Sequence, residues 1–138
     1  MRALMAGLVL TLTAASVAGC QKAGQATPLK ELQRARSGTM NVILLSDADA
    51  LRRGKDSFVL EFRGADGQLA DVGTVSITAT MTMPGMSPMF GDTAVKATAT
   101  AGRYDVTSDL NMAGTWRMNV EWNGPAGRGS ASLPGTVL

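Results

Sequence analysis

The stretch Thr74–Asp92, TVSITATMTMPGMSPMFGD, combines a β-strand pattern with the most unusual chemical cluster of the chain. Apolar residues recur at every second position, and threonine or serine occupies the positions between them. This period of two is typical of a strand with one buried and one exposed face. Pro84 cannot donate a hydrogen bond to a neighbouring strand, so we expect a loop carrying Met86 and Met89 to follow. The apolar face comprises Val75, Ile77, Ala79, Met81 and Met83.

Short strand-like segments separated by turn residues continue on both sides of that stretch. Asp66-Gly67 is a strong hairpin signal, and Pro134 restricts the last strand to a sheet edge. About seven such strands, spaced near ten residues apart, predict an all-β, immunoglobulin-like antiparallel β-sandwich spanning residues 39–138. The expected strands are Met40–Leu45, Ser57–Arg63, Thr74–Met83, Thr93–Thr100, Arg103–Thr107, Thr115–Trp122 and a final run ending near Val137.

The predicted strands share a set of large apolar residues at inward positions. A mature chain of this size can bury enough apolar surface to fold without disulfides. We expect the core to be built from Phe58, Phe62, Val75, Ile77, Tyr104, Trp116 and Val120.

The first 20 residues have the features of a bacterial lipoprotein signal. Arg2 is followed by an uncharged, largely apolar run and then by Val17-Ala18-Gly19-Cys20. The run is shorter than the roughly 20 residues that a membrane-spanning helix needs, which favours a cleaved leader. We therefore predict a signal peptide over residues 1–19 and a diacylglycerol on Cys20, anchoring a protein that faces the periplasm. Gln21 favours the outer membrane in enteric-type bacteria. An ordinary secretory peptide cut elsewhere is the alternative.

Residues 20–38 are mostly polar and read as a lipidated tether. Thr27 could cap a short helix that begins at Pro28, although the apolar pattern lasts barely two turns. The basic side chains of this segment could rest on anionic lipid head groups, at about 1 kcal/mol each. A flexible spacer is the favoured alternative.

Composition argues against several classes of function. The chain has no histidine and one cysteine, so histidine-dependent catalysis and zinc sites built from histidine or clustered cysteine are excluded. Asp47 and Asp49 lie in a turn-like segment and read as solvated loop residues. The 13 basic residues less Arg2 leave 12 against 11 acidic ones, with no basic run for nucleic acid. We expect neither an enzyme nor a nucleic-acid-binding protein.

Three segments together resemble the YtkA-like domain family, whose members are similar to FixH-like proteins. The segments are MTMPGMSPM at 81–89, GRYDV at 102–106 and LNMAGTWRMNV at 110–120. The resemblance covers roughly residues 40–122 and implies a small extracytoplasmic immunoglobulin-like sandwich. It also implies a binding or accessory role, often associated with copper handling or with membrane efflux and oxidase-assembly complexes. Relatives commonly have a histidine after the methionines, where this chain has Ser87 and Pro88.

Without that imidazole, the remaining donors are thioethers, which suit Cu(I) rather than Cu(II). The first hypothesis is a Cu(I) or Ag(I) site formed by Met81, Met83, Met86 and Met89. The alternative for these residues is structural: the first two continue the core face and the others fill the end of the sandwich. The alternative function is an envelope interaction module that docks on a transport or assembly complex and binds no metal.

Overall fold

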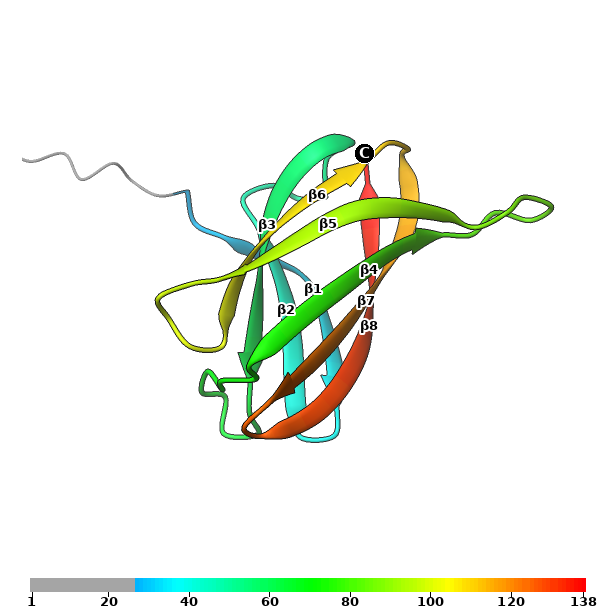
Figure 1. The fold of residues 1–138 in the computed structure, drawn as a ribbon. Helices are drawn as coiled ribbons and strands as arrows, with labels where there is room; N and C mark the ends of the chain where they lie inside the picture. The colour runs from blue at the N-terminus through cyan, green and yellow to red at the C-terminus, as the bar shows by residue number, and fades with distance from the viewer. Residues whose placement is uncertain (1–26) are drawn as a thin grey trace, which may run out of the picture.

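The computed structural model describes residues 27–138, which form eight strands and no helix (Figure 1). All pairings between strands are antiparallel, which confirms the predicted all-β sandwich. No helix in this part of the chain is long and apolar enough to cross a membrane. The predicted signal peptide and Cys20 lie outside the described residues. The strands are β1 (Lys30–Ser37), β2 (Met40–Ser46), β3 (Gly54–Arg63), β4 (Thr74–Met81), β5 (Met89–Ala97), β6 (Arg103–Leu110), β7 (Gly114–Gly124) and β8 (Gly127–Val137).

The eight strands follow the order β1-β2-β3-β6-β5-β4-β7-β8. Strand β5 belongs to both halves, because Asp92–Ala97 pairs with β6 and Met89–Gly91 pairs with β4. Figure 1 shows β5 crossing from one layer towards the other, with the β4–β5 hairpin projecting beyond the body of the domain. The sheet thus folds over on itself, and the apolar faces of its two halves enclose one core.

Strand β5 changes layer at Gly91, where the chain passes over the core. A Cβ atom on this residue would collide with the side chain of Leu110 and would approach the ring of Trp116 to 3.3 Å. The absence of a side chain therefore lets the backbone of β5 lie directly on two buried core residues. This close approach fixes where the two halves of the sheet join.

All seven residues predicted for the core are buried, with exposed fractions of 9% or less. Phe62 lies at the centre of an aromatic group, because its ring meets Tyr104 and Trp122 edge-on at centroid distances of 5.4 and 5.3 Å. Edge-to-face contacts of this kind stabilise a core beyond the apolar area they bury. The period-two pattern thus identified the buried faces correctly.

The predicted tether at residues 20–38 is wrong over its last part, because Lys30–Ser37 forms strand β1 and pairs with β2. The first described residues, 27–29, are not helical either. Strand β1 lies at a sheet edge and is polar, with only Leu32 and Ala35 packed partly against the core. An irregularity between Glu31 and Gln33 also interrupts its alternation. The strand therefore lacks a clear period-two pattern.

Two boundaries around the Met-rich loop also differ from the prediction. Strand β4 ends at Met81, two residues before Met83, and β5 begins at Met89, four residues before Thr93. The turn at Pro84 draws Met83 out of the ladder, and Met89 pairs with Met81 on its return. Strand β8 is an edge strand, as Pro134 predicted.

The sandwich has two distinct ends. At the upper end β1, β3, β5 and β7 begin, and β2, β4, β6 and β8 end; the lower end is the opposite one. Between β2 and β3, the backbone of Leu51 donates to Thr136 and accepts from Leu138. In the same connection, Asp49 accepts a 2.6 Å hydrogen bond from Lys30, the first residue of β1. The β2–β3 connection therefore joins the two edge strands at the upper end.

We predict that Tyr104→Phe destabilises the domain and flattens its alkaline pH dependence. The Tyr104 hydroxyl donates a 2.6 Å hydrogen bond to the carbonyl of Gly73. Its loss should lower the free energy of unfolding by about 1 kcal/mol in urea at pH 7. Burial and then the charge of Asp71 raise the pKa of Tyr104, whereas a backbone bond at Val72 opposes them.

Because the folded pKa exceeds the unfolded one, wild-type stability should be constant below about pH 10 and fall above it. Chemical unfolding between pH 8 and 11 should show a smaller decline for Tyr104→Phe than for the wild type. Parallel curves for the two proteins would contradict this account. Tyr104 is the only tyrosine of the chain, so phenolate absorbance reports its titration directly.

We predict that Asp92→Asn stabilises the domain by about 0.2–1 kcal/mol, because Asp92 lies directly opposite Asp109 and like charges at such positions repel. The matched control is Asp105→Asn on the same sheet. Asp105 lies opposite Lys96, so its neutralisation should destabilise slightly. Urea unfolding at low salt measures both variants. Shifts of the same sign in the two variants would refute the cross-strand explanation.

Candidate functional site

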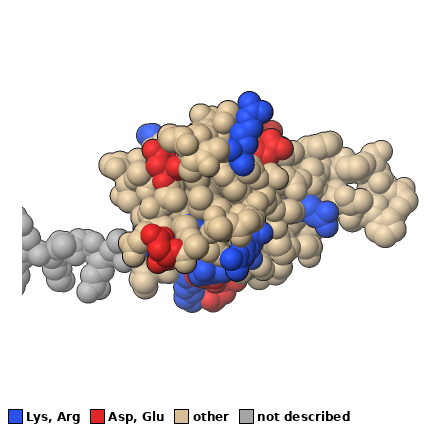
Figure 2. All heavy atoms as spheres, turned by 90° about the horizontal axis from the view of Figure 1, so that it is seen from below, with Lys and Arg blue, Asp and Glu red and all other residues tan. Residues whose placement is uncertain are grey.

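The β4–β5 hairpin carries most of the predicted site. Its tip is a β-turn over Met83-Pro84-Gly85-Met86, in which the Met86 N–H donates to the Met83 carbonyl at 3.2 Å. Gly85, the third residue, has the positive φ of +75° that a type II turn requires, and proline is common at the second position of such a turn. The segment from Thr82 to Phe90 contains no charged residue. Figure 2 shows the end of this projecting arm as an uncharged surface.

Met81 lies beneath the hairpin as part of the core. Its exposed fraction is 5%, and it pairs with Met89 across β4 and β5. The methyl group of Met81 lies 2.7 Å from the position that a Cβ on Gly114 would occupy, so the start of β7 rests on it. Met81 therefore packs as the structural alternative anticipated.

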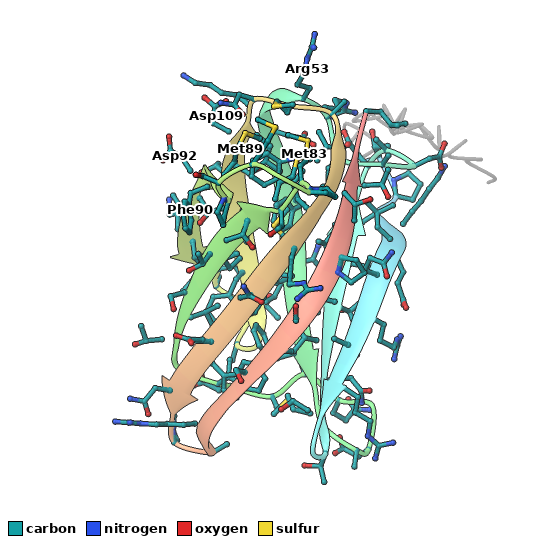
Figure 3. The ribbon with its side chains drawn as sticks, turned by 90° about the vertical axis from the view of Figure 1, so that its right-hand side faces the viewer. Arg53, Met83, Met89, Phe90, Asp92 and Asp109 are labelled. Carbon is teal, nitrogen blue, oxygen red and sulfur yellow. The ribbon has the colours of Figure 1, made fainter. Side chains whose placement is uncertain are left out.

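Met83 and Met89 occupy an intermediate position. Both are partly buried and pack against the core from the two arms of the hairpin. Figure 3 shows their side chains close together at the upper end of the sandwich. Both side chains therefore lie between the packed interior and solvent.

Met86 is separated from this pair. It lies at the tip of the turn, with 58% of its surface exposed. The hairpin therefore holds the four methionines of the predicted site at three levels: one buried, two partly buried and one exposed. The same-face spacing that strand geometry predicts for Met81 and Met83 does not apply, because Met83 lies outside β4.

The side chains that the hairpin offers as metal donors between Met81 and Phe90 include thioethers but no imidazole, thiolate or carboxylate. Within residues 27–138, no group of three or more histidine, cysteine, aspartate or glutamate side chains is arranged to hold a metal ion. Thioethers do not titrate in the physiological range and prefer soft ions. The donors on this hairpin that favour a soft ion are therefore its thioethers.

Met112 is a fifth methionine at this end, and the sequence pattern did not single it out. It lies in the turn between β6 and β7 and is 37% exposed. The indole N–H of Trp116 donates a 3.0 Å hydrogen bond to its carbonyl, which fixes the turn to a fully buried side chain. Met112 is far from the hairpin in sequence, so only the strand order could have related the two.

Other exposed groups surround the hairpin base. Phe90 points outward from β5 with 70% of its surface exposed. Figure 3 places Asp92, Asp109 and Arg53 around the same end as Met83 and Met89. The upper end therefore combines an exposed aromatic ring and a methionine cluster with both signs of charge at its margin.

A comparison with family models finds a match to the family described as YtkA-like over residues 35–121, more than half of the chain. Searches of curated proteins and of solved structures find no match. The matched span runs from the end of β1 into β7 and includes both the Met-rich hairpin and the turn with Met112. The chain therefore belongs to the YtkA-like family.

Proposed function

We propose that this protein is a lipid-anchored, non-enzymatic accessory protein of the periplasm that binds Cu(I) or Ag(I) through thioethers at the upper end of its sandwich. The observation that carries the proposal is the placement of Met83 and Met89. Both side chains are partly buried against the core at the base of a hairpin whose segment from Thr82 to Phe90 has no charged residue. Cu(I) and Ag(I) favour soft sulfur donors in low coordination numbers.

The role of each methionine differs in this proposal. Met83 and Met89 are the primary ligands, whereas Met81 packs beneath them and supports their position. Met86 reaches the ion only if the turn folds back over its own base. The site should accept Cu(I) and Ag(I), ignore Zn(II) and bind Cu(II) poorly, since it offers no imidazole, thiolate or carboxylate cluster.

A docking module that binds no metal is the second candidate, and exposed apolar groups favour it. Phe90 and Met86 are 70% and 58% exposed on an uncharged, projecting hairpin. Such a surface is typical of a contact with another protein. Its partner would be an envelope transport or assembly complex. A docking surface has no reason to respond to a soft metal ion, so metal titration separates the two functions.

We predict that the full-length protein in detergent binds one Cu(I) under anaerobic conditions. Met83→Leu and Met89→Leu should each weaken binding by at least about tenfold, which corresponds to about 1.4 kcal/mol. Met86→Leu should have a smaller effect. Wild-type affinity should change little between about pH 5 and 8, because thioethers carry no titrating proton, unlike histidine.

Two leucine variants serve as controls for that titration. Met118→Leu alters a buried core residue, and Met40→Leu alters a partly buried methionine at the lower end. Neither should change the affinity. Equal binding by all the proteins, or no binding by any, would remove the metal proposal and leave the docking module.

We predict that Cys20→Ala prevents lipidation of the protein. The wild type should fractionate with membranes and carry the mass of an acylated chain that starts at Cys20. The variant should be released or should remain unprocessed. Membrane fractionation with mass spectrometry gives the result, and a Cys20→Ala protein found in membranes at normal mature size would disprove the lipoprotein signal.

A further inference from the structure

We propose that Met112 is a third thioether ligand of the same site, so that the ion lies between the β4–β5 hairpin and the β6–β7 turn. This inference rests on the proposed metal function and extends it to a second element. The ligand set would be Met83, Met89 and Met112, which suits the three-coordinate sulfur environment that Cu(I) accepts.

The turn that carries Met112 lies next to the base of the hairpin. The pairing of β5 with β6 ends at Asp92 opposite Asp109, and one residue further along each chain the side chain of Leu110 lies directly against Gly91. Gly91 is two residues from Met89, and Leu110 is two residues from Met112. Both methionines therefore lie two residues from one contact between β5 and β6.

Two further contacts hold the turn in that position. The indole N–H of Trp116 donates a hydrogen bond to the Met112 carbonyl. The ring of Trp116 also lies close to the backbone of Gly91. Gly114, at φ +133°, rests against the methyl group of Met81, which pairs with Met89. The turn is therefore fixed to the hairpin base on two sides. A side chain at Gly114 would push it away.

The exposure of Met112 suits a ligand. Met118, two residues after Trp116, is 1% exposed and is fully committed to the core, whereas Met112 is 37% exposed. Its flexible side chain can reorient without opening a cavity. The turn from Asn111 to Ala113 also contains no charged residue that would compete for the ion or repel it.

The test follows the methionine methyl groups during Ag(I) titration of the full-length protein in detergent, labelled with ¹³C at the methyl carbon of methionine. Ag(I) is a diamagnetic substitute for Cu(I), and leucine variants assign each signal. We expect the methyl signals of Met83, Met89 and Met112 to shift together and to saturate at one equivalent. The signals of Met40 and Met118 should stay in place.

Affinity measurements complete the test. Met112→Leu should weaken Ag(I) binding by at least about tenfold, as Met89→Leu does, whereas Met40→Leu should not. A Met112 signal that stays in place while Met83 and Met89 shift would overturn this inference and leave the proposed function intact. A shifted signal with unchanged affinity in Met112→Leu would overturn it as well. No shift at any methionine would reject both.

Discussion

The contact of Leu110 and Trp116 with the bare backbone of Gly91 is the constraint on which the rest of the fold depends. Because Gly91 has no side chain, β5 can leave β6 and join β4 while lying on the core. The same crossing sends the β4–β5 hairpin past the body of the domain (Figure 1). It also brings the start of β5 beside the β6–β7 turn. One steric requirement thus joins the two layers and assembles the upper end.

The buried faces of the sandwich were predictable because their residues obey a strict alternation. Val75, Ile77, Tyr104, Trp116 and Val120 are inward positions in their strands, and all are buried. Strand β1 was not predictable in this way, because an edge strand can carry polar groups on most of its surface. Its Arg34 forms an ion pair with Glu31 instead of packing. The alternation of apolar and polar residues therefore identifies a strand that contributes to the core. It is less able to identify a strand that lies at the edge and contributes little to the core.

The candidate site was predictable only in part. The four methionines Met81, Met83, Met86 and Met89 are close in sequence, but the sequence does not show how their burial differs. Met81 is buried, Met83 and Met89 are partly buried, and Met86 is exposed. The proline-glycine turn determines that distribution, because it ends the ladder before Met83 and lifts Met86 to its tip. Met112 depends on strand order and on the Trp116 hydrogen bond, and neither is encoded in a short motif.

The position of Lys30 has a consequence for how the protein would be oriented. Strand β1 begins at the upper end, beside the end of β2, and so begins at the same end as the methionine cluster. If Cys20 carries the lipid, nine residues separate the anchor from Lys30, so the ten steps along the chain span at most about 36 Å when fully extended. The upper end would then be the end joined to the bilayer. Any ion held there would lie at the end of the domain to which the anchor is joined, within reach of proteins embedded in that membrane.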